Sequence, residues 1–415
     1  MELKRVVVTG FGAITPIGNN AQEYWENLIK GESGAAPITL FDTTNFKTKF
    51  ACEVKNFDPL NYFDKKESKK MDRNTQFGIA SAREAVAHSR IIEDNCNKDR
   101  IGVIWGSGIG GLETFEKEVL GWAASTGIPR FNPFFIPKMI VDITPGHISI
   151  EYGFHGPNYA TVSACASSAN ALIDGKMLIQ LGKADIIVCG GSEAAVTASG
   201  VGGFNAMMAL STRNDDPKTA SRPFDKDRDG FVLGEGAGSI ILEEYEHAKK
   251  RGATIYAELK GGGMSADAYH MTAPHPEGLG AYLVMKNCLE DAGVSTHEVD
   301  HINMHGTSTP LGDVAESNAI SKLLGDHAYN IQINSTKSMT GHLLGAAGVI
   351  EAIAVLGSVT HSIVPPTINH FTDDERIDSR LNFTFGKAVQ KNVDIAMSNT
   401  FGFGGHNACV LFSKI

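Results

Sequence analysis

The chain has 415 residues, of which 42% are hydrophobic and 20% are charged, so it can bury a sizeable core and is not a disordered protein. The formal net charge of −10 argues against nucleic acid as its main partner. The sequence shows no zinc-type Cys/His spacing, no signal peptide and no apolar run as long as a membrane helix. We therefore expect a cytoplasmic, reduced protein without a metal site.

Short strand-like runs alternate along the chain with longer helical patterns. The expected strands lie at residues 4–10, 99–106, 184–191, 238–244, 301–306 and 394–399. The expected helices lie at residues 74–89, 166–182, 278–293 and 342–358. Because the strands are largely apolar throughout, the pattern indicates an α/β protein with buried sheets.

The second half of the chain repeats features of the first. A strand followed by a polar, glycine-rich turn occurs at residues 99–111 and again at 301–313. A course from a strand through a helix of small residues occurs at 161–191 and, in similar form, at 333–366. These repeats predict two related halves, residues 1–250 and 251–415.

Cys165 lies in the stretch TVSACASSANAL, where a strand ends and a helix of small residues begins. A thiol at the start of a helix meets free N–H groups and the positive end of the helix dipole, and both favour the thiolate. The small neighbours leave room for a substrate. We therefore expect Cys165 to be the exposed, reactive thiol among the six cysteines.

Two histidines stand at comparable places. His305 follows a strand and precedes GTSTPLGD, and His342 lies in KSMTGHLLGAAG, before a second helix of small residues. Each one alone is more simply explained as a core histidine. Because reactive groups of α/β proteins gather at the carboxyl ends of strands, the three residues together indicate one site for nucleophilic chemistry.

The stretches TVSACASSANAL, HGTSTPLGD, KSMTGHLLGAAG and NTFGFGGHN resemble, in the same order, the motifs of the condensing enzymes of the thiolase superfamily. The sequence is most similar to the elongating β-ketoacyl-acyl-carrier-protein synthases of type II fatty-acid synthesis, over nearly the whole chain. The resemblance implies thiolase-like duplicated βαβ halves in a layered α/β/α/β/α sandwich. It also implies a homodimer that condenses an acyl-enzyme thioester with malonyl-acyl-carrier protein and releases carbon dioxide. No cofactor is implied beyond the phosphopantetheine arm that the carrier-protein substrate brings.

The resemblance assigns roles to individual residues. The implied catalytic residues are Cys165, His305, His342, Lys337 and Phe403. Cys165 is the acylated nucleophile, the two histidines receive the malonyl thioester oxygen, and Lys337 supports His342, with Glu351 behind it. The backbone N–H groups of Cys165 and Phe403 form an oxyanion hole, and the Phe403 ring gates the acyl pocket.

The implied substrate-binding residues are Thr307 and Thr309 for the phosphopantetheine arm, Ile109, Phe204 and the partner subunit's Phe134 for the acyl pocket, and Phe401 and Thr272. His406 departs from the family, which usually has a small hydroxyl residue before Asn407. We interpret His406 as a substituted loop position and not as a third catalytic histidine.

One basic segment stands out in this acidic chain. It contains Lys65, Lys66, Lys69, Lys70 and Arg73. If residues 65–73 form one helix, these side chains fall within an arc of about 140°, with the acidic residues of the segment outside it. A solvated helix face would have the same pattern. Because acyl carrier proteins are acidic, the resemblance favours a docking face for the carrier protein.

Other protein classes share parts of this pattern. Residues 106–111, GSGIGG, match the GxGxxG turn of a dinucleotide site, but the acidic second strand that such a site requires does not follow. A polyketide-type ketosynthase would keep Cys165 and both histidines and stays open as the alternative. A thiolase would replace one histidine by cysteine, an initiating synthase would pair one histidine with asparagine, and a non-catalytic chain-length partner would lack the nucleophile. A purely binding protein is the non-enzymatic alternative.

Overall fold

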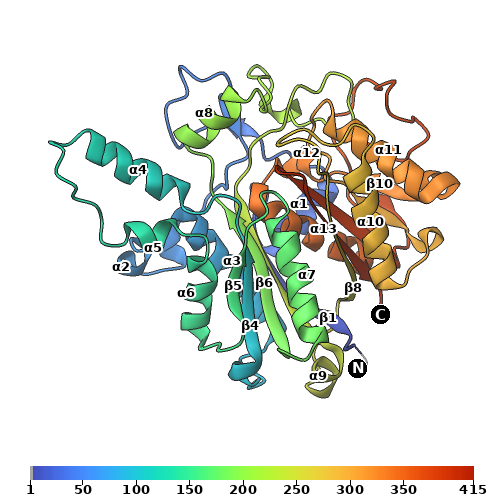
Figure 1. The fold of residues 1–415 in the computed structure, drawn as a ribbon, viewed down its shortest axis with the longest axis horizontal. Coiled ribbons are helices and arrows are strands. Elements are labelled where there is room, and N and C mark those ends of the chain that lie inside the picture. The colour runs from blue at the N-terminus through green and yellow to red at the C-terminus, as the bar shows by residue number, and fades with distance from the viewer. Residues whose placement is uncertain (1–2) are drawn as a thin grey trace.

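A computed structural model describes residues 3–415 and is built on a ten-stranded mixed sheet (Figure 1). In spatial order the strands are β10 (Gln332–Asn334), β9 (His301–Asn303), β13 (Ile395–Gly402), β14 (His406–Ser413), β8 (Ala257–Ala266), β1 (Val6–Ile14), β7 (Gly236–Glu244), β6 (Ile186–Glu193), β4 (Ile101–Gly106) and β5 (Asn158–Thr161). Two small sheets pair β2 (Ala36–Pro37) with β3 (Phe50–Ala51), and β11 (Ile363–Val364) with β12 (Val389–Gln390).

The sheet has the same strand order in both halves of the chain. Counted outward from the centre, β1, β7, β6, β4 and β5 correspond to β8, β14, β13, β9 and β10. Corresponding neighbours are parallel or antiparallel alike. The halves join through a short antiparallel pairing in which Val7 faces Glu258 and Val8 faces Ala257. A duplicated chain would produce this order, while the boundary at residue 250 stays a prediction.

The helices cover both faces of the sheet. They are α1 (Ala21–Lys30), α2 (Lys65–Ser68), α3 (Arg73–Ser89), α4 (Leu112–Ala123), α5 (Phe135–Met139), α6 (Ile143–Tyr152), α7 (Ser167–Gln180), α8 (Ala198–Ala206), α9 (Tyr245–Lys250), α10 (Leu279–Ala292), α11 (Gly312–Leu324), α12 (Lys337–Thr340) and α13 (Ala347–His361). α7 and α13 pack on each other and on strands of both halves, so they form a central layer. α3 and α6 cover one half from outside, and α10 covers the other. The predicted α/β/α/β/α order is thus confirmed, with the two β layers joined as one sheet.

The expected strands and helices all form, with ends shifted by a few residues. Several elements were not predicted, among them the helices α1, α4, α6 and α11 and the strand β8. Its sequence, AELKGGGMSA, contains three glycines, which disfavour an isolated strand. In the structure Gly261 and Gly263 let α10 lie directly against the strand, while Gly262 faces Ile173 of α7 on the other side of the sheet. A Cβ atom on Gly263 would be 2.2 Å from the Val284 carbonyl oxygen, so only glycine fits this packing.

The expectation that no run is long and apolar enough to cross a membrane is wrong, because the region of helix α13 contains such a run. Together with the preceding 3₁₀ turn η6 (Leu344–Ala346), α13 gives the stretch Leu344–His361, 18 residues with a mean hydropathy of 1.5. However, 83% of this stretch is buried inside the protein. Its apolar composition reflects its position in the central layer, where sheet strands and helix α7 surround it.

Candidate active site

A cavity of about 680 Å³ brings together residues from both halves of the chain. Cys165, His305 and His342 all line it, as the sequence predicts. The same wall contains the following predicted substrate-binding and gate residues: Ile109, Phe204, Thr272, Thr307, Thr309, Phe401 and Phe403. Phe134 does not line the cavity and is 43% exposed at the start of α5; the prediction concerned the partner subunit's Phe134.

Cys165 lies between β5 and α7, and its sulfur is 3.0 Å from Nε2 of His342. The preceding residue, Ala164, has a φ of +51°, which is strained for a residue with a side chain. Cys165 and His342 occupy corresponding places in the two halves, each before a helix of the central layer. The duplicated topology therefore explains why two residues that are 177 positions apart touch.

The prediction that Cys165 is an exposed thiol is wrong. The residue is only 7% exposed, because the loops around the cavity cover the start of α7. Burial raises the pKa of the Cys165 thiol to about 12, although the charge of Lys337 and the N–H groups of Phe403 and Cys165 itself lower it. Of the six cysteines only Cys96 is partly exposed. The resting nucleophile is therefore a protonated thiol, and the 3.0 Å contact gives its proton a route to His342.

Both catalytic-type histidines are uncharged. Burial and the charge of Lys337 hold the pKa values of His305 and His342 well below the ordinary value of 6.5. The pKa of His305 is lowered further because His305 and His342 would repel each other if both were protonated. The two rings lie edge to face, with centroids 5.1 Å apart. A neutral imidazole still carries one N–H donor, so the pair can donate two hydrogen bonds into the cavity.

Lys337 is buried and forms an ion pair with the equally buried Glu351, as predicted for this lysine. Burial raises the pKa of Glu351 to about 7, against the opposing effect of Lys337. The lysine does not touch the thiol, but its charge lowers the pKa values of Cys165, His305 and His342. It therefore favours the thiolate and the neutral imidazoles at once.

Glu316 is a buried residue of the site that the sequence analysis missed. Its carboxylate accepts hydrogen bonds from the backbone N–H of His305 at 2.9 Å, the backbone N–H of Gly306 at 3.0 Å and the side-chain amide of Asn399 at 3.0 Å. Burial raises its pKa to about 7. The only signal in the sequence is an acidic residue on the buried face of a helix, 11 positions after His305.

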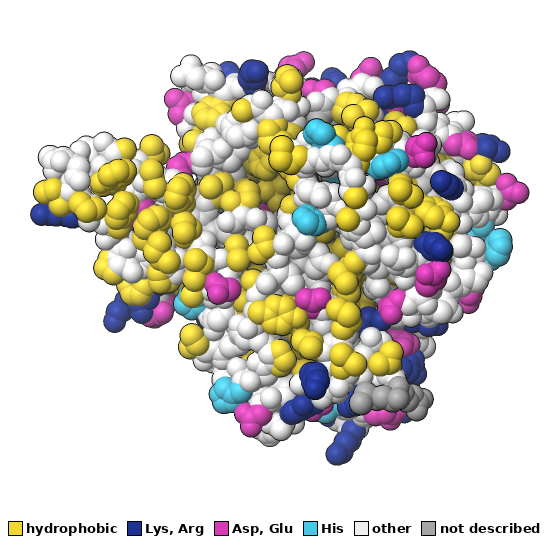
Figure 2. All heavy atoms as spheres, in the orientation of Figure 1, with side chains coloured by type: hydrophobic (Ala, Val, Ile, Leu, Met, Phe, Trp, Pro, Cys, Tyr) yellow, Lys and Arg dark blue, Asp and Glu magenta, His cyan; other side chains and the backbone are white. Residues whose placement is uncertain are grey.

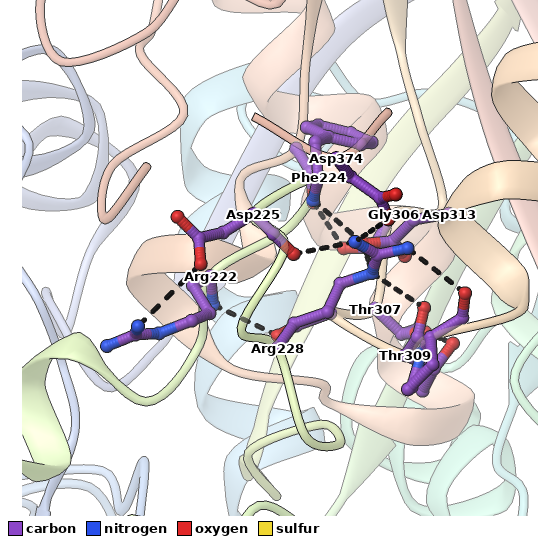
Figure 3. A network of polar contacts seen from close by, with 12 residues as sticks. Arg222, Phe224, Asp225, Arg228, Gly306, Thr307, Thr309, Asp313 and Asp374 are labelled. Atoms are coloured by element: carbon purple, nitrogen blue, oxygen red, sulfur yellow. Dashed lines mark hydrogen bonds and ion pairs between the residues drawn. The ribbon is translucent and has the colours of Figure 1, made fainter. Parts of the chain in front are cut away.

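The loop that carries Thr307 and Thr309 is held from behind by Arg228 (Figure 3). Arg228 donates to the carbonyl oxygens of Thr309 and Pro310, each at 3.0 Å, and forms an ion pair with Asp374 at 2.8 Å. The two threonine hydroxyls are 3.0 Å apart on the cavity side of this loop. The buried arginine therefore fixes the wall that is predicted to bind the phosphopantetheine arm.

The segment around Phe403 forms a tight turn between β13 and β14. The backbone N–H of Phe403 and that of Cys165 both contact the Cys165 sulfur. These are the two groups that are predicted to form the oxyanion hole. Gly404 and Gly405 have φ values of +88° and +75°, which residues with side chains rarely adopt. The His406 ring packs over this turn outside the cavity, which agrees with a substituted loop position. Gating by the Phe403 ring stays a prediction.

The predicted basic helix face is wrong in part. Helix α2 ends at Ser68, and α3 begins at Arg73 with Asp72 as its N-cap, so residues 65–73 do not form one helix. Arg73 is turned inward, 18% exposed, in an ion pair with Glu235 at 2.6 Å. The nearby Lys70 pairs with Glu67 at 2.6 Å. The exposed basic residues that remain are Lys65, Lys66 and Lys69.

The GSGIGG turn does not have the geometry of a dinucleotide site. The backbone N–H groups of Gly108, Ile109 and Gly110 all donate to the carboxylate of Glu193, within 3.3 Å. The anion-binding groups of the turn are thus occupied by the protein itself. In addition, helix α4 and not a second strand follows the turn.

The fold, together with the meeting of Cys165, His342 and His305 in one cavity, defines an acyltransferase of the thiolase-like class. The chain belongs to the β-ketoacyl synthase family: the model of the N-terminal domain matches residues 3–248, and that of the C-terminal domain matches residues 256–371.

Relatives span the whole chain. It is 49% identical to the 3-oxoacyl-[acyl-carrier-protein] synthase 2 of Synechocystis sp., over 100% of this chain and 99% of the relative. The structure of a β-ketoacyl synthase from Burkholderia phymatum has a TM-score of 0.92 and 33% identity, covering 99% of this chain and 100% of that one. A type II polyketide ketosynthase, solved in complex with its acyl-carrier protein and bound to the hexaketide, has a TM-score of 0.92 and 32% identity, covering 100% of both chains.

Proposed function

We propose that this protein extends an acyl chain by two carbons, through decarboxylating condensation of an acyl thioester on Cys165 with malonyl-acyl-carrier protein. The observation that carries the proposal is the meeting of Cys165, His342 and His305 in one cavity, with the sulfur 3.0 Å from the His342 nitrogen. The 49% identity to a synthase named for this product class supports it. The reaction uses no cofactor beyond the phosphopantetheine arm of the carrier protein.

In the first half-reaction the Cys165 sulfur attacks the acyl thioester. The thiol proton moves to His342 and then to the departing sulfur of the carrier arm. The backbone N–H groups of Cys165 and Phe403 stabilise the negative oxygen of the tetrahedral intermediate. Thr307 and Thr309 bind the arm, and the acyl chain lies along Ile109 and Phe204.

In the second half-reaction the malonyl carboxylate leaves as carbon dioxide, and its bonding electrons form an enolate. His305 and His342 donate N–H groups to the enolate oxygen. For His342 this requires that its proton has moved from Nδ1 to Nε2, because Nε2 is unprotonated when it accepts the thiol proton. The enolate carbon then attacks the acyl carbonyl, and the Cys165 sulfur leaves as a thiolate. The thiolate takes up one proton from solvent, which balances the carboxylate charge lost with carbon dioxide. Neutral histidines can perform this step, because a neutral imidazole still carries one N–H that it can donate to the enolate oxygen.

The test is to incubate the protein with acyl-carrier proteins of graded chain length and then with malonyl-carrier protein, with the products identified by mass spectrometry. We expect a thioester on Cys165 and one 3-oxoacyl product that is longer by two carbons. Products extended by several rounds without reduction would favour the polyketide alternative. Higher identity to the fatty-acid relative, 49%, than to the polyketide ketosynthase, 32%, favours a single extension. A protein that forms no thioester would be a binding protein.

We also propose that Lys65, Lys66 and Lys69 dock the acidic carrier protein. Replacement of all three lysines by Glu should raise the KM for carrier-protein substrates roughly tenfold. This estimate assumes that each charge at the rim of the interface contributes about 0.5 kcal/mol to binding. The salt dependence of KM should weaken, and small pantetheine thioesters should react as before. The control is reversal of Lys249 and Lys250 on α9, which lies far from α2 (Figure 1). Equal losses with both substrate types would contradict docking.

The second partner that we propose is another copy of the chain. Helix α4 and the loop after it project from the body, and apolar side chains gather over this region (Figures 1 and 2). The exposed apolar residues from α4 through α5 and α6 to just past the end of β5 are Phe115, Leu120, Trp122, Ile128, Phe131, Phe134, Ile136, Ile140, Ile150, Tyr159 and Val162. β5 is the last strand of the sheet, so its outer edge can pair with a second β5. We expect light scattering to give twice the chain mass of 44.4 kDa; the mass of one chain would contradict the dimer.

We place the dimer in the cytoplasm.

A further inference from the structure

Glu193 is a buried carboxylate that the reaction does not use. It stands at the end of β6 and is 0% exposed. Its Oε2 accepts from the backbone N–H of Gly108 at 2.7 Å and from that of Gly345 at 3.0 Å. Its Oε1 accepts from Ile109 at 3.1 Å, while Ser107 and Gly110 donate at 3.3 Å. Five donors thus converge on one carboxylate, which is an unusual concentration for a buried group.

These donors belong to two segments that both line the cavity. Ser107–Gly110 is the loop after β4, and its Ile109 side chain forms part of the cavity wall. Gly345 lies in the turn between His342 and α13. A single oxygen, Oε2, is shared by Gly108 from the first half and Gly345 from the second half. The carboxylate therefore sets the distance between the wall at Ile109 and the segment that carries His342.

The loop has few other supports of this kind. The Ser107 hydroxyl accepts from the N–H of Gly110 at 3.1 Å, and the Ser107 N–H donates to the Thr161 carbonyl oxygen at 3.4 Å. Gly108 and Gly110 have no side chains that could make further contacts. A carboxylate is matched to such a set of N–H groups, because it can accept at both oxygens and carries the charge that the converging dipoles stabilise. An amide in its place would direct N–H groups at some of these donors.

We propose that Glu193 is the positioning residue of the acyl pocket: it holds the Ser107–Gly110 loop against Gly345 and so fixes where Ile109 stands in the cavity wall. This inference rests on the proposed function, since it assumes that an acyl chain lies along that wall. Glu193 makes no hydrogen bond to the reacting atoms and acts on the pocket through Ile109. Its charge also raises the pKa of the Cys165 thiol, and that effect should be the same for every chain length. Its loss should therefore change which chain lengths are accepted more than whether acyl transfer occurs.

The test compares Glu193→Gln with wild type for the rate of thioester formation at Cys165, over acyl-carrier proteins of graded chain length. We expect the ratio of rates between the preferred and the disfavoured chain lengths to fall roughly tenfold, the order that one or two methylene contacts with a pocket wall supply. Ser107→Ala removes one donor and should change the ratio in the same direction but less. This variant keeps the inference testable if Glu193→Gln does not fold.

The matched control is Glu243→Gln on the neighbouring strand β7. Glu243 is also 0% exposed and accepts from Thr9 and Arg251, away from the cavity. Glu243→Gln should lower the melting temperature but leave the ratio of rates between preferred and disfavoured chain lengths unchanged. The inference is overturned if Glu193→Gln keeps the wild-type ratio, or if both glutamine variants lower the ratio alike. A wild-type protein without a thioester at Cys165 would overturn the proposed function together with this inference, whereas normal wild-type loading with an unchanged variant would overturn this inference alone.

Discussion

Cys165→Ala should fold normally and form no acyl-enzyme. Alanine fits among the small residues around position 165, and the cavity beside the thiol accommodates the lost atom, so the effect on stability should be small. The substitution removes the thiol that contacts His342, so thioester formation and condensation should both be lost. Mass spectrometry of the intact protein after incubation with acyl-carrier protein measures the first, and product formation measures the second.

The matched control for this variant is Cys96→Ala. Cys96 is the most exposed of the six cysteines and is absent from the cavity lining. This variant should load an acyl chain and condense it at the wild-type rate. An acyl group on the Cys165→Ala protein would show that another residue is the nucleophile.

His305→Ala and His342→Ala should each slow malonyl decarboxylation by about 10²–10³-fold, the usual effect of removing one donor to a developing oxyanion. The two variants should differ in the first half-reaction. His342 contacts the sulfur at 3.0 Å, so its loss should also slow acyl loading, whereas His305→Ala should load almost normally. The double variant should lose less than the product of the two single losses, because both donors act on one oxygen. Single-turnover loading and carbon dioxide release separate the two steps.

His301→Ala is the control for these variants. His301 is also buried and lies on β9, only four residues before His305, where burial lowers its pKa to about 4. It contacts the Gln332 carbonyl oxygen at 3.1 Å and is not part of the cavity lining. Its replacement should reduce stability and leave the ratio of decarboxylation to loading unchanged. If His305→Ala decarboxylated at the wild-type rate, the role of His305 would have to be reassigned.

The sequence predicts best those residues whose place follows from strand ends. Cys165, His305 and His342 each come after a strand. The strands before the two histidines, β9 and β10, are parallel neighbours whose carboxyl ends meet, and the duplicated order of the sheet gives Cys165 a place corresponding to His342, so their convergence is readable without coordinates. Glu316 and Glu193 are not readable in this way. Their partners are backbone N–H groups, which have no residue identity, and Gly345 is 152 positions away from Glu193.

Tertiary packing explains why two predictions about exposure were wrong, namely that Cys165 is exposed and that residues 65–73 present one basic helix face. The depth of Cys165 depends on the loops that close the cavity over the start of α7, and no local pattern encodes their position. The predicted basic helix face is interrupted at Asp72. The side chain of Asp72 accepts hydrogen bonds from the N–H of Asn74 and from the hydroxyl of Thr114 on α4. This residue starts a new helix and directs Arg73 toward Glu235. A helical projection of residues 65–73 could not anticipate such a break.

The high pKa of the Cys165 thiol, about 12, has a consequence for covalent inhibitors. At neutral pH the resting enzyme offers almost no thiolate, so intrinsic electrophilicity alone does not make a reagent selective for this cysteine. A reagent must first occupy the cavity of about 680 Å³ and then receive the sulfur while His342 takes the proton. Inactivation should therefore approach a maximum rate as the reagent concentration rises. A reagent that cannot enter the cavity should modify Cys96 first, and the same barrier protects the nucleophile from oxidation between turnovers.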